Sequence, residues 1–310
     1  MADPKTGAME GADTRCGFVA LIGAPNAGKS TLVNALVGSK ISIVTPKVQT
    51  TRTLIRGIVC EGAAQLVLVD TPGIFTPRRR LDRAMVGTAW GGVQDADIVA
   101  LLIDARKGVK EEDEAILRRL ADMRSAQTVL VLNKVDLAAK PPLLAVAQSL
   151  NERAAFAATF MISALTGNGL SDLKTWLAAH VPPGPWLYPE DQISDAPLRQ
   201  LAAEITREKL YLRLHQELPY QSAVETDVWK ELKDGSVRIE QTIYVERESQ
   251  RKIVLGKGGH TIKAIGAASR AEIAAAIEQP VHLFLFVKVR GDWGDDPERY
   301  RGMGLEFPQE

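Results

Sequence analysis

A glycine-rich loop with the spacing G-x-x-x-x-G-K-S lies near the start of this chain, at residues 23–30. In such loops, glycines let successive backbone N–H groups turn onto phosphates, while the lysine reaches the outer phosphates and the hydroxyl binds Mg²⁺. An apolar run at 18–22 predicts a buried strand before the loop, and residues 31–37 predict a helix whose N-terminus faces the anion. The predicted phosphate-binding residues are Gly23, Ala24, Pro25, Asn26, Ala27, Gly28, Lys29, Ser30 and Thr31, and Lys29 is also predicted to be catalytic.

The motif at residues 133–136 has side chains that suit the recognition of a guanine base. It follows an apolar strand at 128–132, so its side chains should emerge where ligands of parallel sheets bind. Asp136 can accept from both the ring N–H and the exocyclic amino group of guanine, whereas adenine would leave its charge unpaired. We expect Asn133 to brace the loop and contact the base, and the stem of Lys134 to cover its face. A second base-binding motif is predicted at Ser163, Ala164 and Leu165. In it, the backbone N–H of Ala164 would donate to the guanine carbonyl oxygen.

A Mg²⁺ site is predicted from residues between the glycine-rich loop and the end of the strand at 65–69. Asp70 ends that strand and can take Mg²⁺ through water, together with the hydroxyl of Ser30. Thr51 precedes an arginine, as the Mg²⁺-binding threonine does in related GTPases, although two adjacent threonines are otherwise ordinary loop residues. The motif after the strand consists of Asp70, Thr71, Pro72 and Gly73. We expect the Gly73 N–H to sense the γ-phosphate and count Thr51 and Gly73 with Lys29 as catalytic. The ordered motifs together predict a site for GTP, GDP and Mg²⁺.

Ile74 stands where Ras-like switches carry the glutamine that orients the attacking water. An isoleucine has no hydrogen-bonding group, so the water must be positioned otherwise. In GTPases that resemble this one, the asparagine equivalent to Asn26 helps to coordinate a K⁺ near the β- and γ-phosphates, supplying charge where an arginine finger would go. Asn26 is therefore a candidate K⁺ ligand, with a simple turn residue as the alternative.

Composition indicates a chain with more than one domain and no marked charge bias. The chain has 310 residues, with 38 Lys and Arg against 38 Asp and Glu, so net charge predicts no particular partner. Cys16 and Cys60 have no paired spacing and suggest a reducing compartment. Residues 1–15 are polar, and no run approaches the roughly 18 apolar residues of a membrane helix. We therefore expect a cytoplasmic protein with no signal peptide and a disordered tail at residues 1–16.

Alternating strand and helix patterns predict a doubly wound α/β GTPase domain over residues 17–180. The first two strands after the loop, at 54–60 and 65–69, are expected to pair antiparallel around Glu61-Gly62. Further strands are predicted at 98–104, 128–132 and 160–162, and helices at 111–123, 143–154 and 170–179. Residues 78–80, three arginines, are interpreted as a solvated charge run, with a partner contact as the alternative.

Prolines at the start of residues 181–197 end this pattern and predict a linker to a second, smaller α+β domain at 198–310. A helix at 198–215 is followed by strands at 222–232 and 237–245, a helical segment before the loop at 256–259, a helix at 261–277 and a strand at 281–289. This α-β-β-α-α-β order, with a G-x-x-G loop between two helices, matches the type II KH RNA-binding module.

The G-x-x-G loop predicts contact with a sugar-phosphate chain of about four nucleotides, because its glycines leave bare backbone. A lone G-x-x-G is otherwise a plain helix turn, and the rest of the domain is not basic. Residues 247–263, however, carry five cationic side chains against Glu248 alone. The predicted RNA-binding residues are Arg247, Arg251, Lys252, Gly256, Lys257, Gly258, Gly259 and Lys263.

These motifs together resemble the Era family of bacterial GTPases, from about residue 17 to the tail. The most family-specific stretches are 41–45, 49–52, 207–210, 217–220, 245–248 with 256–259, and 280–283. The resemblance implies a GTP-hydrolysing assembly factor that binds near the 3′ end of 16S ribosomal RNA on the maturing 30S subunit. It also implies peripheral association with the inner membrane. At position 257 this chain has Lys, whereas the family more often has Asn. We also expect the protein to be a monomer.

Two alternatives from other functional classes stay open. A signalling GTPase whose second domain binds a protein partner would keep the nucleotide motifs but need no RNA. Salt-sensitive binding to single-stranded RNA distinguishes the two, because counterion release is required of a true RNA binder. A passive RNA-binding protein with a decayed GTPase is disfavoured by the intact Lys29, Ser30, Asp70 and Asp136.

Overall fold

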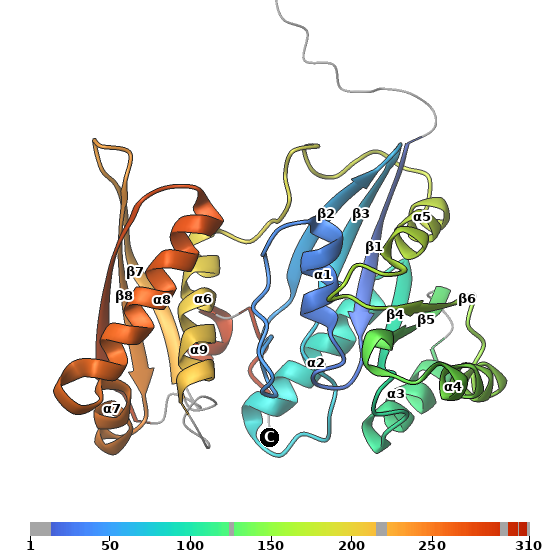
Figure 1. Ribbon diagram of the computed structural model, residues 1–310, viewed down its shortest axis with the longest axis horizontal. Coiled ribbons are helices and arrows are strands. Elements are labelled where there is room, and N and C mark those ends of the chain that lie inside the picture. Colours follow the sequence, from blue (N-terminus) through green and yellow to red (C-terminus); the bar gives the residue numbers. More distant parts are fainter. Residues whose placement is uncertain (1–13, 124–126, 215–221, 292–296, 303, 309–310) are drawn as a thin grey trace, which may run out of the picture.

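The fold is taken from a computed structural model that describes residues 14–123, 127–214, 222–291, 297–302 and 304–308. Two sheets, each with its own helices, lie side by side (Figure 1). The predicted disordered tail, apart from residues 14–16, and the family-specific stretch at 217–220 lie outside the described residues.

The first domain is built on a six-stranded sheet with strand order β2-β3-β1-β4-β5-β6. β2 pairs antiparallel with β3, as predicted, and the other neighbouring strands are parallel. The strands are β1 (Arg15–Ile22), β2 (Ile55–Glu61), β3 (Ala64–Asp70), β4 (Ile98–Asp104), β5 (Gln127–Asn133) and β6 (Ala158–Ile162). The doubly wound sheet predicted from the alternation of strands and helices is confirmed.

Helices cover both faces of this sheet, because successive strand residues point to opposite sides. In β1, Val19 and Leu21 pack in a cluster with α1 and α5, whereas Ala20 and Ile22 pack in a cluster with α2, α3 and α4. The helices are α1 (Lys29–Val37), α2 (Arg80–Gln94), α3 (Glu111–Ala121), α4 (Lys140–Arg153) and α5 (Leu170–His180). The sequence did not predict α2, whose first turn contains the end of the arginine run.

The second domain has a three-stranded sheet with β8 (Val237–Val245) in the centre. β7 (Ser222–Glu231) pairs antiparallel with β8, and β9 (Val281–Val289) pairs parallel with it. The helices α6 (Leu198–Arg213) and α8 (His260–Ile277) pack together beside the sheet, and α7 (Glu248–Leu255) precedes the glycine loop (Figure 1). The α-β-β-α-α-β order is confirmed.

The predicted linker, residues 181–197, contacts the first domain. It follows the outer edge of the first sheet, where the Ile58 N–H donates to Ile193 O at 3.0 Å and Gln65 Nε2 donates to Tyr188 O at 2.8 Å. At the other end of the chain, Tyr300 of α9 (Pro297–Gly302) and Leu305 pack against Leu81 and Met85 of α2. The sequence assigned these last residues to the second domain, but they pack on the first.

Cys16 and Cys60 are both free thiols. None of the helices in the described ranges is long and apolar enough to span a membrane.

Candidate functional site

The glycine-rich loop between β1 and α1 has a backbone that only glycine can adopt at two positions. Gly23 has φ +147°, and a Cβ there would lie 2.3 Å from Leu102 O. Gly28 has φ +102°, and a Cβ there would lie 2.2 Å from Asn133 Nδ2. The loop borders a cavity of about 340 Å³ that residues 43–47, Thr50, Thr51, Gly73 and Lys134 also line. The glycines therefore let the loop pack closely against its neighbours, and its backbone N–H groups precede α1 as an anion site requires.

Lys29 lies in this loop with its ammonium on backbone carbonyls. Nζ donates to Gly23 O and to Ala24 O, each at 3.1 Å. Burial lowers the pKa of Lys29 to about 8, and the nearby Asp70 carboxylate opposes that shift. A phosphate chain in the cavity would favour the charged form further, so Lys29 is placed to bind the outer phosphates.

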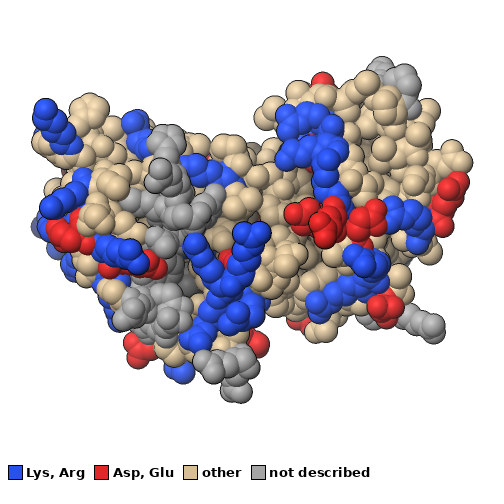
Figure 2. Space-filling model, turned by 90° about the horizontal axis from the view of Figure 1, so that it is seen from below, with Lys and Arg blue, Asp and Glu red and all other residues tan. Residues whose placement is uncertain are grey.

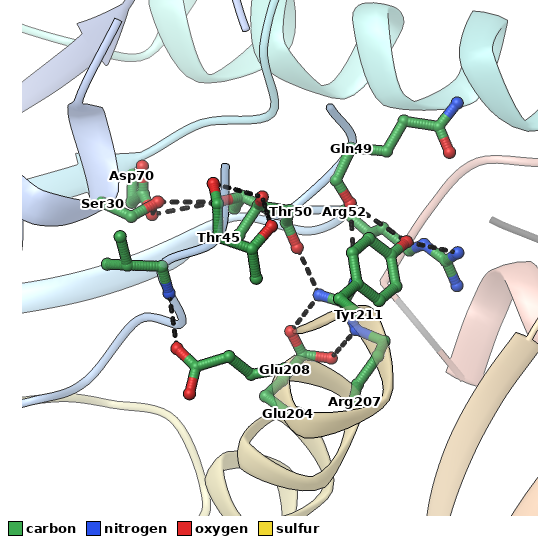
Figure 3. Close-up of polar contacts among 12 residues, drawn as sticks. Ser30, Thr45, Gln49, Thr50, Arg52, Asp70, Glu204, Arg207, Glu208 and Tyr211 are labelled. Carbon is green, nitrogen blue, oxygen red and sulfur yellow. Dashed lines mark hydrogen bonds and ion pairs between the residues drawn. The ribbon is translucent and has the colours of Figure 1, made fainter. Parts of the chain in front are cut away.

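The three predicted Mg²⁺ ligands come together from three different segments (Figure 3). Ser30 Oγ lies 2.8 Å from Thr51 Oγ1 and 2.7 Å from Asp70 Oδ2, and Thr51 Oγ1 lies 3.3 Å from the same carboxylate oxygen. Burial raises the pKa of Asp70, while Ser30, Lys29 and Thr51 oppose that rise. Two hydroxyls and a carboxylate are the hard oxygen donors that Mg²⁺ prefers, so the residues present fit the ion.

Asn133 joins the predicted base-binding motifs to the phosphate loop. Its Nδ2 donates to Ala27 O at 2.9 Å, and its Oδ1 accepts from the N–H groups of Lys134 and Ala164 at 2.8 and 3.0 Å. The Ala164 N–H, which we expected to donate to guanine, thus donates to Asn133 here. Asp136 follows in a short 3₁₀ turn, η1 (Val135–Leu137), with its carboxylate exposed. The bracing role of Asn133 therefore has direct support, and the carboxylate of Asp136 is accessible to a base.

Lys134 and the motif at residues 163–165 complete the predicted base-binding region. Lys134 has φ +66°, and its Nζ pairs with Asp104 Oδ2 at 2.8 Å and donates to Asn26 O. Ser163 is buried and its Oγ accepts from the Thr166 N–H, whereas Leu165 is 79% exposed. Sequence reasoning missed Asp104. Its signal was a carboxylate that ends a buried strand at the same sheet edge as Asn133.

The segment after Asp70 lies against the phosphate loop. A Cβ on Gly73 would lie 2.9 Å from Pro25 Cα, and the Ile74 N–H donates to Gly23 O at 3.1 Å. Thr71 Oγ1 donates to Leu21 O at 2.7 Å, so its hydroxyl braces β1, and both Thr71 and Pro72 are buried. The side chain of Ile74 is buried in the core, as its lack of polar groups favours.

Asn26, the candidate K⁺ ligand, has φ +63° and donates from Nδ2 to Pro46 O at 2.9 Å. Its side chain therefore bridges the phosphate loop and the segment that carries Thr51. The amide oxygen carries the available lone pairs, so it is the atom that we expect to bind a cation.

The second predicted site is the loop that joins α7 to α8. Gly256 has φ +70°, and a Cβ there would lie 2.2 Å from Thr261 Oγ1, whereas a Cβ on Gly258, at φ +61°, would meet nothing within 4 Å. Lys257 and Gly258 are exposed. The cationic side chains predicted to bind RNA lie on this loop and its two helices, although Arg251 also pairs with Glu248 at 2.9 Å. The remaining members are Arg247, Lys252, Gly259 and Lys263.

A groove of about 400 Å³ runs between α8 and β9 beside this loop. Phe284 and Phe286 project from β9 and are 44% and 48% exposed, and Lys263 and Arg270 line the helix side. Sequence reasoning missed both rings. The available signal was their spacing of two residues, which places both on one face of a strand that follows a helix rich in small residues. Exposed aromatic rings beside a bare backbone loop suit stacking with unpaired bases.

Seen from the α7 end, Lys and Arg side chains form separate groups over both domains, with acidic side chains between some of them (Figure 2). This distribution agrees with the zero net charge of the chain. Electrostatic attraction to nucleic acid would therefore depend on local groups of charge.

Comparison with known families places both parts of the chain. Residues 18–134 match the family described as 50S ribosome-binding GTPase, and residues 217–294 match the KH domain family. Among curated relatives, GTPase Era of Afipia carboxidovorans is 72% identical over 297 residues, which cover 96% of each protein. GTPase Era of Brucella suis biovar 1 is 68% identical over 305 residues, which cover 98% of each.

Two solved structures are similar over nearly the whole chain. One is the crystal structure of Era in complex with MgGDPNP and nucleotides 1506–1542 of 16S ribosomal RNA, and the other is a variant of Aquifex aeolicus Era bound to GDP·AlF4⁻. Each is 36% identical, with a TM-score of 0.89, over 94% of this chain and 99% of the other.

Proposed function

The chain belongs to the Era family of GTPases, and from that premise we propose that it hydrolyses GTP and binds 16S ribosomal RNA near its 3′ end in 30S subunit assembly. The observation that carries the nucleotide half is the meeting of Ser30, Thr51 and Asp70 within 2.7–3.3 Å of one another beside the phosphate loop.

In this proposal Ser30 and Thr51 would hold Mg²⁺ together with Asp70, whose carboxylate would act through water. The ion, when bound, neutralises charge that develops on the β- and γ-phosphates. Lys29 binds the outer phosphates, the N–H of Gly73 marks the γ-phosphate, and Asp136 selects guanine. With Ile74 buried, we assign the extra positive charge at the phosphates to a K⁺ held by Asn26.

The RNA half rests on the α7–α8 loop and the adjacent groove. The backbone at residues 256–259 would follow the sugar-phosphate chain, and Phe284 and Phe286 would stack bases. Era in the similar complex binds nucleotides 1506–1542 of 16S ribosomal RNA, and its fold matches this chain at a TM-score of 0.89. We further propose a cytoplasmic monomer, with the peripheral membrane association that the family resemblance implies.

Crosslinking of the full chain in cells, followed by sequencing of the attached RNA, tests the partner directly. We expect reads concentrated near the 3′ end of 16S ribosomal RNA. Titration of that RNA in vitro should show affinity falling about 50-fold between 50 and 200 mM salt, from four neutralised phosphates at a slope of about 0.7 each. Scattered reads with salt-independent binding would favour a signalling GTPase with a protein partner.

A further inference from the structure

The segment that carries Thr51 is held by a helix of the second domain. Residues 40–52 leave α1, pass the nucleotide cavity and meet α6 (Figure 3). Contacts from α6 fall on both sides of Thr51, whereas the hydroxyl of Thr51 points to Ser30 and Asp70. One short segment therefore connects the predicted metal ligands to the second domain.

Arg207 of α6 holds the backbone immediately before Thr51. Its Nη2 donates to Thr50 O, and its Nη1 donates more weakly to Gln49 O at 3.5 Å. The guanidinium is only 2% exposed and is paired with Glu204, whose carboxylate accepts from Nε at 2.8 Å. Burial would lower the pKa of Arg207, but Glu204 more than offsets that effect, so the donors are permanently charged. Gln49 has φ +58°, a left-handed backbone conformation that residues other than glycine rarely adopt unless other contacts stabilise it.

Glu208, the next residue of α6, holds the start of the segment. Its Oε1 accepts from the Val44 N–H at 2.8 Å, and the carboxylate pairs with Lys40 at 2.8 Å. Glu208 is 3% exposed. A buried carboxylate on a backbone N–H makes a charge-assisted bond, which is stronger than a bond between neutral groups.

Arg52 fixes the other side of Thr51. It is buried, and it donates from Nη1 to Ser222 O at 2.9 Å and from Nη2 to the Tyr211 hydroxyl at 3.0 Å. The Tyr211 hydroxyl in turn lies 3.4 Å from Gln49 O. The backbone before Thr51 and the side chain after it are thus both attached to the second domain.

We propose that Arg207 and Glu208 are positioning residues for Mg²⁺ binding, which act from the second domain by holding the segment that presents the Thr51 hydroxyl. This inference rests on the proposed role of Thr51 as a Mg²⁺ ligand. Neither α6 residue is among those that line the nucleotide cavity. Their effect is to reduce the conformational freedom that Thr51 would lose when it binds the metal. The position of the second domain and the retention of Mg²⁺ are consequently linked, and each stabilises the other.

The test is the release of a fluorescent GTP analogue from the full chain while Mg²⁺ is titrated. Arg207→Met removes the donors to Thr50 O at similar side-chain length. We expect the Mg²⁺ concentration for half-maximal slowing of release to rise about 5- to 10-fold, which corresponds to the loss of one hydrogen bond of ordinary net strength, about 1 to 1.4 kcal/mol. Release in excess EDTA should be unchanged, because the variant keeps the phosphate loop and Asp136.

The same substitution in a Thr51→Ala background separates positioning from general damage. If Arg207 acts through the Thr51 hydroxyl, it should change the Mg²⁺ dependence of Thr51→Ala by less than about twofold. An equal shift in both backgrounds, or none in the wild-type background, would overturn the inference. If Thr51→Ala itself leaves the Mg²⁺ dependence unchanged, the proposed metal ligand is wrong as well, so the two failures can be told apart.

Two further variants control for folding and for the interface as a whole. Arg207→Lys keeps the charge beside Glu204 and should restore part of the Mg²⁺ affinity, which keeps the test usable if Arg207→Met folds poorly. Glu272→Gln removes the pairing of α8 with Lys40 and Lys209 but leaves the contacts to residues 44–51 in place. It should leave the Mg²⁺ dependence at the wild-type value, and a shift as large as that of Arg207→Met would overturn the specific role of Arg207.

Discussion

The chain contains two glycine-rich loops, and each is predicted to place bare backbone against a phosphate chain. In the first loop the protein itself surrounds the glycines, since a Cβ at Gly23 or Gly28 would lie within 2.3 Å of other atoms. In the second loop Gly258 has open space around it, and a Cβ on Gly259 would approach only the end of Lys263, at 3.9 Å. The first loop is thus part of a packed core, whereas the second is an exposed turn held at Gly256. A small ligand with one defined geometry suits the first arrangement, and a long flexible chain suits the second.

The largest expected effect would break the first site and leave the second intact. Asp136→Asn replaces the carboxylate that accepts from guanine with an amide that presents a donor. We expect GTP affinity to fall by about 10⁴-fold, with selectivity moving toward xanthine nucleotides, whose carbonyl replaces the amino group. Competition binding with GTP and XTP measures both effects. Unchanged GTP affinity would contradict the base assignment, and a parallel loss of RNA affinity would contradict the separation of the two sites.

Matched alanine substitutions in the two loops would sharpen the comparison. Gly28→Ala should lower GTP affinity at least about 100-fold, because about 3 kcal/mol of strain at φ +102° adds to the clash with Asn133. Gly258→Ala should lower RNA affinity by only about tenfold, since the strain at φ +61° comes without any clash. Titration of each variant with both ligands gives four affinities. Equal losses for the two substitutions would show that packing does not distinguish the loops.

The pH dependence of GTP binding should reveal the burial of the first loop. Lys29 has a pKa lowered to about 8, and a phosphate chain raises it again. Below pH 8 the lysine is charged before and after binding, so affinity should be flat. Above pH 8 binding must take up a proton, so affinity should fall by up to about tenfold per pH unit. Calorimetry at pH 8.5 in two buffers of different ionisation enthalpy measures this uptake, and its absence would place the pKa of Lys29 well away from 8.

The smallest expected effect concerns the cation at the first loop. We predict slow hydrolysis that is several-fold faster in K⁺ than in Na⁺, and loss of that difference in Asn26→Ala. The assay is the rate of phosphate release at matched ionic strength. Equal wild-type rates in the two salts would leave Asn26 as a turn residue that binds Pro46.

Much of the fold was predictable because most strands of the first domain are apolar runs between polar turns, whereas β7 and β8 alternate apolar and polar residues. The bounds predicted for β4, β8 and β9 agree with the structure to the residue, and the other strands differ by one to three residues. Helix α2 was missed because it begins in an arginine run and contains three glycines, which have low helix propensity. Its buried Leu81, Met85, Ala89 and Val93 nevertheless recur at the four-residue spacing of a helix, which was the signal available in the sequence.

The nucleotide motifs were predictable for a related reason, since each lies at a strand end of a sheet whose order is regular. The contacts around Thr51 could not be predicted from the sequence. Arg207 and Glu208 are charged residues on a helix, a pattern typical of a solvated face, and their partners are backbone groups of residues 44 and 50. A backbone carbonyl has no sequence signature. The packing of Tyr300 and Leu305 on α2 joins segments more than two hundred residues apart, and it could not be predicted from the sequence either.

We expect this one chain to bind two phosphate chains through two separate glycine-rich loops. Lys257→Asp combined with Gly258→Asp tests it most directly, because aspartate tolerates the left-handed backbone at Gly258 and sets negative charge against RNA. The loop lies about 18 Å along α8 from Glu272 and the domain interface, so the nucleotide site should not sense the change. We predict that RNA affinity falls at least about 100-fold, from two unfavourable charges at the phosphates, while GTP affinity stays within about twofold. Retained RNA affinity in the folded double variant, or a parallel loss of GTP affinity, would contradict the account.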